Sequence, residues 1–284
     1  MELIKTRREL NNRRVQLKKE NKTVGFVPTM GALHQGHLSL VENAGQHCDV
    51  VVVSIFVNPT QFNDPGDLER YPRDLEKDIQ LLENSASELL FAPSVKEVYP
   101  ESDTRTFDFG YLDRVMEGKH RPGHFNGVAQ VVSRLFEVVE PDKAFFGQKD
   151  FQQLAIIRKM VRQMNSGIEI VACPIVRESD GLAMSSRNAL LTKKHRKSAP
   201  LIAKTLKESC NFVSLKSVAE TEAFVRNQID QDENLDTEYF EIVNGDTLLP
   251  VDTWEESPYI VGCIAVLAGT VRLIDNIIYK KPVK

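Results

Sequence analysis

The sequence predicts an α/β protein with a Rossmann-like parallel sheet, helices on both of its faces, and a smaller α+β domain in the C-terminal part. Three observations predict this fold. Apolar runs alternate with stretches of helical spacing over the first 175 residues, polar motifs directly follow the apolar runs, and the last part of the chain alternates as antiparallel strands do. We therefore expect one domain over residues 1–175 and a second over residues 176–284 that acts as a lid.

Strands and helices are expected to alternate along the first domain. Apolar, β-branched runs predict strands at residues 23–27, 49–56, 88–92, 143–146 and 168–173. Helical spacing predicts helices at residues 38–44, 75–82, 127–139 and 150–163. Parallel strands joined by right-handed crossovers bring their carboxyl ends to one edge of the sheet, where ligands bind.

The pattern of apolar and polar residues changes after Pro174. A polar loop at residues 177–188 precedes a charged helical region that extends to about residue 211. Alternating apolar residues then predict antiparallel strands at 239–243, 259–267 and 270–278. These elements make up the smaller domain.

Composition excludes several classes of protein. The chain has 284 residues, 42% of them hydrophobic, and a net charge of −4, which argues against a protein that mainly binds nucleic acid. No apolar stretch is long enough to cross a bilayer, so we expect no membrane contact. The four cysteines are widely spaced and no secretory leader precedes the first domain, so a cytoplasmic location is expected.

Two histidines lie between the first predicted strand and the first predicted helix. Residues 28–37 read Pro-Thr-Met-Gly-Ala-Leu-His-Gln-Gly-His, which places His34 and His37 in a strand-to-helix turn. At such a turn the first N–H groups of the helix are unpaired and its dipole is positive, which favours a phosphate. Imidazoles there can donate hydrogen bonds to phosphate oxygens, and Gly31 and Gly36 let backbone approach a ligand.

Two other interpretations of this turn stay open on spacing alone. The histidines can be a satisfied polar pair in an ordinary turn. They can also belong to a zinc site, although zinc needs further ligands and the other histidines and cysteines are scattered along the chain.

A second candidate phosphate site lies near the predicted domain boundary. Residues 179–188 contain two adjacent serines, Ser185 and Ser186, followed by Arg187, on a loop that Gly181 can bend. Hydroxyls and a guanidinium suit a clamp for a polyphosphate leaving group. The alternative is an ordinary interdomain loop whose serines cap the next helix. The chain has no P-loop, no Gly-x-Gly-x-x-Gly and no Gly-x-Ser-x-Gly motif.

Six blocks of the sequence together carry a resemblance to a known family. They are residues 28–37, 56–62, 71–73, 121–125, 146–153 and 180–188. In this order they resemble the pantothenate synthetase family of the His-x-Gly-His nucleotidyltransferases. The resemblance implies an ATP-dependent condensation of pantoate with β-alanine that releases AMP and pyrophosphate. It also implies a pantoyl adenylate intermediate, ATP as a substrate with Mg²⁺, a homodimer, and no residue bonded covalently to substrate.

The resemblance also implies roles for individual residues. His34 and His37 would contact ATP phosphates, and His37 is the better candidate for proton donor. Lys149 would meet phosphate as a point charge, Asp150 would accept from ribose hydroxyls, and Ser185, Ser186 and Arg187 would hold the outer phosphates. Gln61 and Gln153 would hold pantoate and β-alanine. The ATP-binding residues would be Met30, Gly31, Ala32, Leu33, His34, Gln35, Gly36, His37, Gly147, Gln148, Lys149, Asp150, Val176, Met184, Ser185, Ser186 and Arg187.

Four further residues have weaker assignments. Asp78 corresponds to a carboxylate near the magnesium ion, but it lies among other acidic residues on what can be a plain helix face. Arg121 and His124 are expected to close over pyrophosphate. Gln148 stands where the family usually has Glu, a change we expect to tune nucleotide contacts rather than abolish activity.

Three other functions compete with this one. A nucleotidylyltransferase that stops after AMP or CMP transfer would share the first turn but would not need Gln61 and Gln153. A regulatory nucleotide-binding module would not need phosphate donors at both ends of the site. An aminoacyl-tRNA synthetase would need an anticodon domain, for which we expect the chain to have no room, and a basic face, which its sequence does not provide.

Overall fold

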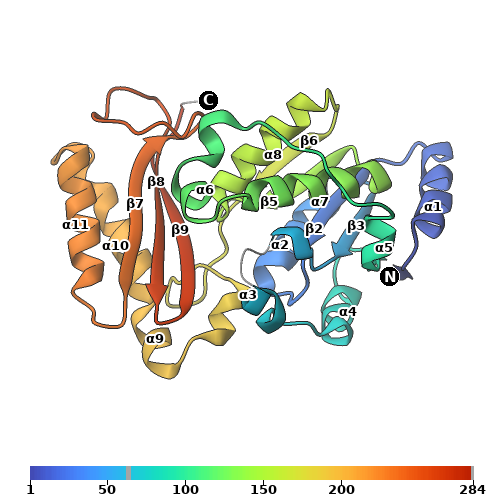
Figure 1. Cartoon of the computed structure of the whole chain (residues 1–284), viewed down its shortest axis with the longest axis horizontal. Helices are drawn as coiled ribbons and strands as arrows, with labels where there is room; N and C mark the ends of the chain where they lie inside the picture. Colours follow the sequence, from blue (N-terminus) through green and yellow to red (C-terminus); the bar gives the residue numbers. More distant parts are fainter. Residues whose placement is uncertain (62–64, 283–284) are drawn as a thin grey trace. The chain divides into compact units, whose positions relative to one another are not determined.

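The computed structural model describes residues 1–61 and 65–282. The chain divides into two compact units (Figure 1). The first comprises Met1–Asp113, Glu117–Gln148 and Gln153–Pro174, and the second comprises Arg114–Met116, Lys149–Gln152 and Ile175–Lys284. Two short segments of the second unit thus come from the part of the sequence assigned above to the first domain. Phe62, the last residue of one quoted block, lies outside the described residues.

The first unit contains a parallel six-stranded sheet, as the sequence predicts. Its strands are β1 (Glu2–Ile4), β2 (Val24–Thr29), β3 (Val50–Ile55), β4 (Leu89–Phe91), β5 (Lys143–Gly147) and β6 (Glu169–Cys173). They lie in the order β1-β4-β3-β2-β5-β6, and each neighbouring pair is parallel. Only β1 is absent from the predicted strands, because its sequence Glu-Leu-Ile has just two apolar residues and no apolar run beside them.

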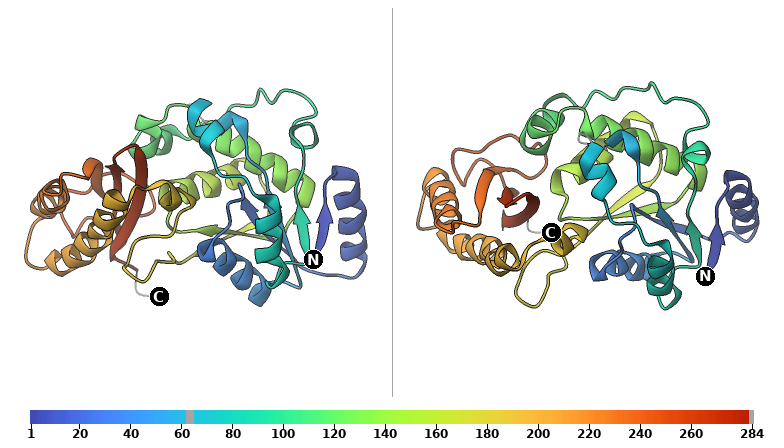
Figure 2. Two further views of the ribbon diagram at one scale, coloured as in Figure 1. Left: turned by 90° about the horizontal axis from the view of Figure 1, so that it is seen from below. Right: turned by 60° about the horizontal axis from the view of Figure 1, so that its bottom comes forward.

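Helices cover both faces of this sheet (Figure 2). The helices in this part of the chain are α1 (Arg7–Lys19), α2 (Gln35–His47), α3 (Pro65–Arg70), α4 (Leu75–Glu83), α5 (Val95–Val98), α6 (Met116–His120), α7 (His124–Val139) and α8 (Phe151–Gln163). Short 3-10 turns are η1 (Pro59–Gln61) and η2 (Gly110–Asp113).

Alternate strand residues supply two separate cores. Phe26 of β2 and Val52 of β3 pack with residues of α1, α7 and α8, whereas the adjacent Val27 and Val53 pack with residues of α2 and α4. Successive strand residues point to opposite faces, so α1, α7 and α8 cover one face and α2 and α4 the other. Buried on both faces, the strands read as continuous apolar runs.

The strand order reverses at β2, which has β3 on one side and β5 on the other. Sheets of this kind bind ligands outside the carboxyl ends of the strands at this switch point. The segments after β2 and after β5 both start at this place in the sheet. The two motifs at residues 30–37 and 147–150 therefore begin where this topology predicts that a ligand binds.

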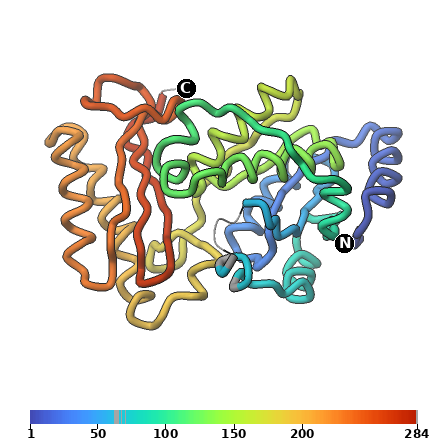
Figure 3. The backbone as a smooth tube through the Cα atoms, viewed as in Figure 1, coloured from blue at the N-terminus to red at the C-terminus, as the bar shows by residue number. Residues whose placement is uncertain are grey.

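A long extended segment joins α5 to η2 and follows α7, as the trace in Figure 3 shows. Gln130 of α7 donates hydrogen bonds to the carbonyl groups of Asp103 and Arg105, at 3.1 and 2.7 Å. Asn126 of the same helix accepts from the Phe107 N–H at 3.0 Å. Polar side chains on α7 thus replace the β-ladder partners that this segment lacks.

The second unit contains an antiparallel sheet of β7 (Asp236–Asn244), β8 (Ile260–Ala268) and β9 (Val271–Lys280), in that order. Its helices are α9 (Lys193–Ser198), α10 (Pro200–Ser209) and α11 (Val218–Asp230), with 3-10 turns η3 (Ser186–Leu190) and η4 (Cys210–Phe212). α10 contacts α11 and β9, and α11 contacts β7, around one apolar core. The three predicted strands are confirmed, while α11 lies beyond the helical region that the sequence indicated.

Over the described residues, no helix combines the length and the apolar character needed to cross a membrane.

Candidate active site

The turn after β2 is anchored at its start and capped at its end. The Thr29 hydroxyl donates to the Ser54 carbonyl at 2.7 Å and accepts from the Gly31 N–H at 3.2 Å, which joins the turn to β3. His34 is the N-cap residue of α2, with extended backbone, and His37 lies in the first helical turn. α2 begins at Gln35, whereas the sequence predicted a start at residue 38. The difference arises because a histidine here takes the capping role that is more usual for Ser, Thr, Asp or Asn.

The two histidine rings form a reciprocal cap. Nδ1 of His34 accepts from the Gly36 N–H at 3.1 Å, and Nδ1 of His37 accepts from the His34 N–H at 3.3 Å. The ring centroids are 4.1 Å apart. A ring nitrogen that accepts from a backbone N–H carries no proton, so each neutral imidazole carries its proton on Nε2. The cap therefore selects the tautomer in which the Nε2–H of each ring is a hydrogen-bond donor.

The middle of the turn has an unusual backbone conformation. Gly31 has a φ of 80° and Ala32 a φ of 49°, and the second value is uncommon for a residue with a Cβ. A Cβ on Gly31 would lie 2.9 Å from Oδ2 of Asp78 and 3.1 Å from Cγ2 of Ile55. Position 31 therefore requires glycine for both conformation and space.

Asp78 of α4 holds this conformation. Its Oδ2 accepts from the Ala32 N–H at 2.9 Å and its Oδ1 from the Leu33 N–H at 2.7 Å. The residue is only 2% exposed. Burial raises the pKa of Asp78, and the two backbone hydrogen bonds oppose that shift. A single carboxylate thus satisfies two consecutive N–H groups of the turn.

This geometry gives Asp78 a structural role in the turn. Each of its oxygens accepts one backbone hydrogen bond, and a carboxylate oxygen has a further lone pair for another contact. In the part of the chain that the structure describes, no group of three or more His, Cys, Asp or Glu residues could hold a metal ion. Asp78 therefore positions the turn at residues 31–33, and its place near an ATP-bound magnesium ion stays a prediction.

Gln61 lies in η1, and both its side-chain amide and its backbone carbonyl make hydrogen bonds. Its Nε2 donates to Sδ of Met30 at 2.9 Å, and its Oε1 accepts from Nδ2 of Asn58 at 3.3 Å. Its backbone carbonyl accepts from Nδ1 of His124 at 2.9 Å. These contacts bring Gln61, expected to bind substrate, next to Met30, expected to line the nucleotide.

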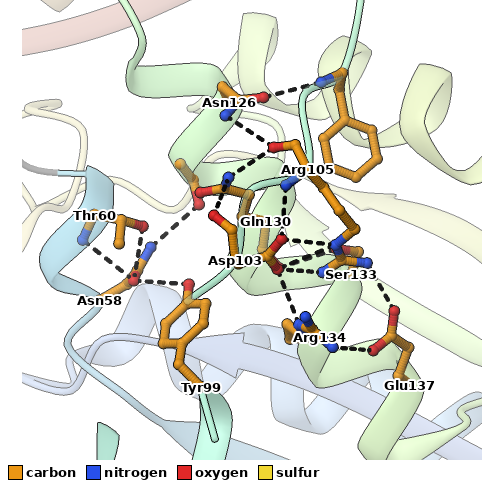
Figure 4. Close-up of polar contacts among 12 residues, drawn as sticks. Asn58, Thr60, Tyr99, Asp103, Arg105, Asn126, Gln130, Ser133, Arg134 and Glu137 are labelled. Carbon is orange, nitrogen blue, oxygen red and sulfur yellow. Dashed lines mark hydrogen bonds and ion pairs between the residues drawn. The ribbon is translucent and has the colours of Figure 1, made fainter. Parts of the chain in front are cut away.

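Asn58 is a residue to which the sequence analysis gave no role. It is fully buried, and its Oδ1 accepts from the hydroxyls of Tyr99 at 3.0 Å and Thr60 at 3.1 Å (Figure 4). Its Nδ2 also donates to the Gly127 carbonyl at 3.2 Å. A buried amide with every contact satisfied fixes one orientation, and here that orientation directs a donor at Gln61. The available signal was its place at a strand end, three residues before Gln61.

His124 has the opposite tautomer from His34 and His37. Its Nε2 is 3.1 Å from Nη1 of Arg121, and a guanidinium can only donate, so Nε2 accepts. Nδ1 then carries the proton and donates to Gln61. The structure thus uses His124 to hold η1, and the contact of Arg121 and His124 with pyrophosphate stays a prediction.

The loop after β5 begins in the first unit. The Gln148 N–H donates to the Cys173 carbonyl at 2.8 Å, which ties the loop to β6. Gly147 ends β5, and Gln153 lies half-buried in the first turn of α8.

The remaining predicted residues belong to the second unit. Lys149 is largely buried, with Nζ 3.4 Å from Oδ1 of the more exposed Asp150. Residues 176–184 fold back on themselves, since the Met184 N–H donates to the Val176 carbonyl at 3.0 Å. Ser185 caps η3 and its hydroxyl oxygen accepts from the Arg187 N–H at 3.3 Å. The serine capping considered above as an alternative is therefore present, and it leaves the Ser185 hydroxyl proton for donation.

Comparisons with known proteins agree with the resemblance. The family model described as pantoate-beta-alanine ligase matches residues 2–278. A curated protein from Phocaeicola vulgatus named pantothenate synthetase is 58% identical over 281 residues, which cover 99% of this chain and 100% of the relative. One of the same name from Bacteroides thetaiotaomicron is 56% identical over the same shares.

Solved structures extend the similarity to the fold. A pantothenate synthetase from Thermus thermophilus matches with a TM-score of 0.92 and 44% identity, over 99% of this chain and 100% of that one. A pantoate-beta-alanine ligase from Francisella tularensis, described as complexed with beta-gamma ATP and beta-alanine, matches with a TM-score of 0.83 and 34% identity over 99% of both chains.

Proposed function

The chain belongs to the pantoate–β-alanine ligase family and is an ATP-dependent ligase that joins pantoate to β-alanine; we propose how its residues do so. The reaction has two steps. A carboxylate oxygen of pantoate attacks the α-phosphorus of ATP, and the bond from that phosphorus to the bridging oxygen breaks, which releases pyrophosphate. The β-alanine amine then attacks the carbonyl of the pantoyl adenylate, loses a proton, and displaces AMP.

The reciprocal histidine cap is the observation that carries this proposal. With Nδ1 of both rings engaged by backbone N–H groups, His34 and His37 offer Nε2–H donors beside the N-terminus of α2. Negative charge grows on the phosphate oxygens as the α-phosphorus is attacked, and preorganised donors stabilise that charge. We assign His37 as the main donor to the leaving group. Met30, Gly31, Ala32, Leu33, Gln35 and Gly36 would line the nucleotide.

Neutral amides suit the acid substrates. Gln61 and Gln153 would bind pantoate and β-alanine, because an amide both donates to a carboxylate and accepts from a hydroxyl or an ammonium group. With Oε1 of Gln61 engaged by Asn58, its Nε2 is the atom that would turn from Met30 to a substrate oxygen.

The second unit would supply the other ATP contacts. Lys149 would meet phosphate, Asp150 the ribose, and Val176 the adenine, while Met184, Ser185, Ser186 and Arg187 would hold the β- and γ-phosphates. Gly147 and Gln148 would complete the nucleotide loop. We propose that residues 176–284 act as a lid that closes when ATP binds.

Magnesium is proposed to enter as a complex with the ATP phosphates rather than on a set of protein ligands. A metal ion there would neutralise charge on the pyrophosphate as it leaves. We further propose a cytoplasmic homodimer that binds neither nucleic acid nor membrane.

Omitting substrates one at a time tests the proposal. We expect ATP, Mg²⁺, pantoate and β-alanine together to yield AMP and pantothenate in equal amounts. Without pantoate no AMP should form, and without β-alanine pyrophosphate release should stop near one equivalent per site. Steady AMP release without β-alanine, or independence of pantoate, would refute the mechanism.

A further inference from the structure

Two neighbouring buried residues of β9 hold two separate nucleotide segments of the second unit. Asp275 and Asn276 are 5% and 3% exposed. Successive residues of a strand point to opposite faces of a sheet. The two side chains therefore leave β9 in opposite directions, and each ends on a segment to which the proposed function gives an ATP contact.

Asp275 holds the base of the loop that carries residues 184–187. Its oxygens accept from Nη1 and Nη2 of Arg177 at 2.6 and 3.0 Å, a bidentate pair with Asp275 almost completely buried. Nη1 of Arg177 also donates to the carbonyl of Gly181, at 3.1 Å. Gly181 has a φ of 92° and forms the bend of the loop. The carboxylate thus fixes the guanidinium that holds the bend.

Further contacts make this loop a rigid one. Asn188 donates to Oε1 of Glu178 at 2.7 Å and to the Ala183 carbonyl at 3.1 Å. Arg196 of α9 pairs with Glu178 and Asp180, both at 2.6 Å. Hydrogen bonds therefore join the two sides of the loop and also hold its base. Its position in the unit then depends on α9, through Arg196, and on β9, to which the base is attached.

Asn276 holds the main chain at Lys149. Its Nδ2 donates to the Lys149 carbonyl at 2.9 Å. Lysine carries its charge on a long flexible stem, so its ammonium is placed only as well as its backbone is. Lys149 follows the loop after β5, where the backbone is not part of a strand or a helix. A buried amide at its carbonyl supplies the restraint that secondary structure does not.

We propose that Asp275 and Asn276 are positioning residues for catalysis: together they fix the distance between Lys149 and the 184–187 loop before ATP binds. The inference rests on the proposed ATP contacts of those two segments. The C-terminal sheet would then be the rigid element that holds both ATP-contacting segments at a fixed distance from each other. Holding groups in place before reaction lowers the entropic cost of reaching the transition state.

The chemistry of the pair predicts a selective effect. Adenylate formation needs the phosphate contacts, whereas attack of β-alanine on a preformed pantoyl adenylate occurs after pyrophosphate has left. Losing the Asn276 hydrogen bond should therefore slow the first half-reaction and spare the second. A residue needed only for folding would lower both half-reactions by the same factor.

Asn276→Ala and Asn276→Asp provide the test, with each half-reaction measured separately and the melting temperature recorded. Asn276→Asp keeps the size of the side chain but replaces the donor with a second acceptor facing the Lys149 carbonyl. The control is Asn244→Ala, which removes an amide from β7 of the same sheet that bonds Ser257 at 3.1 Å. We expect both Asn276 variants to raise the KM for ATP and slow adenylate formation by about tenfold or more, with aminolysis within about twofold.

Lys149→Ala separates the inference from the proposed function. If Lys149→Ala impairs adenylate formation while both Asn276 variants match Asn244→Ala, the positioning role is refuted and the proposed function stands. If Lys149→Ala itself leaves adenylate formation unchanged, the proposed contact of Lys149 fails. Should Asn276→Asp not fold, Asn276→Ala alone decides, and an equal loss in both half-reactions overturns the inference. Asp275→Asn should reproduce the selective loss through the 184–187 loop.

Discussion

At the scale of single residues, the histidine tautomers explain how a neutral side chain can act on an anion. A backbone N–H on Nδ1 keeps the proton of His34 and His37 on Nε2, while a guanidinium on Nε2 of His124 puts its proton on Nδ1. The same side chain type is therefore a proposed phosphate donor in one place and holds Gln61 in another. Hydrogen-bond partners, not residue type, decide between these uses.

Replacing His37 with alanine is expected to lower kcat by about two or more orders of magnitude, because a donor to developing charge is lost. Steady-state kinetics measures this. His47→Ala is the matched control, since His47 is exposed at the far end of α2. Near-normal turnover in the His37 variant would remove that residue from the mechanism.

Asp78→Ala separates the positioning role of this carboxylate from a role at magnesium. Without it the N–H groups of Ala32 and Leu33 lose their acceptor, so the turn relaxes and we expect the KM for ATP to rise about tenfold or more. If Asp78 acts by positioning the turn, half-saturation by Mg²⁺ should stay within about twofold. Glu76→Ala, on the exposed face of α4, is the control. Rescue of the variant by high Mg²⁺ would support the magnesium role instead.

At the scale of elements, close packing of α7 on η1 sets where Gln61 lies. A Cβ on Gly127 would come within 2.5 Å of the Thr60 carbonyl oxygen and 3.0 Å of the Gln61 Cα. Backbone cannot move aside as a flexible side chain can, so only glycine permits this approach. The buried Asn58 then joins the same two elements through its amide.

Gly127→Ala is therefore expected to displace η1 and raise the KM for pantoate about tenfold, with the KM for ATP within about twofold. Substrate titrations with the other substrates saturating provide the measurement. Gly167→Ala is the matched control, because a Cβ there meets nothing within 4 Å. Equal changes for both substrates would show a general disturbance instead of a displaced Gln61.

At the scale of the whole molecule, one buried ion-pair network ties the long segment before η2 to α7 (Figure 4). Asp103 accepts from Nε of Arg134 at 2.9 Å and pairs with Arg105 at 2.6 Å, with its side chain 2% exposed. Hydrogen bonding from Arg105 holds the pKa of Asp103 well below its ordinary value, against the opposing effect of burial. The folded state thus binds this proton less well than the unfolded state does.

A carboxylate with a depressed folded-state pKa stabilises the fold above its unfolded pKa of about 3.9, and that stabilisation is lost as pH falls below it. We expect Asp103→Asn to lower the free energy of unfolding by about 2 kcal/mol at pH 7, with a smaller difference at pH 3. Urea denaturation at both pH values measures it. Glu42→Gln, at an exposed site on α2, should show no such pH-dependent difference.

The proposed lid predicts a change in the dimensions of the enzyme. Closure of residues 176–284 on ATP should reduce the radius of gyration in small-angle scattering. Arg187→Ala removes a proposed contact with the outer phosphates, so it should show a smaller change at the same ATP concentration. Unchanged scattering at saturating ATP would count against a lid.

The sequence alone determined the alternation of strands and helices and the parallel sheet, and it predicted a phosphate site in the turn at residues 28–37. Periodicity and helix-end chemistry are local properties, so they can be read along the chain. The six blocks, taken as a resemblance, then pointed to the ligase family that the comparisons show.

Only the tertiary structure decided what holds those residues in place. Asp78 accepts a hydrogen bond from the N–H group of Leu33, which lies 45 residues before it. Asn58 and Gly127 are 69 residues apart, and Asn276 and Lys149 are 127 residues apart. No local pattern marks such partners, because a buried carboxylate or amide looks in the sequence like any exposed one. The candidate phosphate donors could be named from their own neighbourhood in the sequence. Their positioning could not, since it is supplied by residues that only the fold brings near.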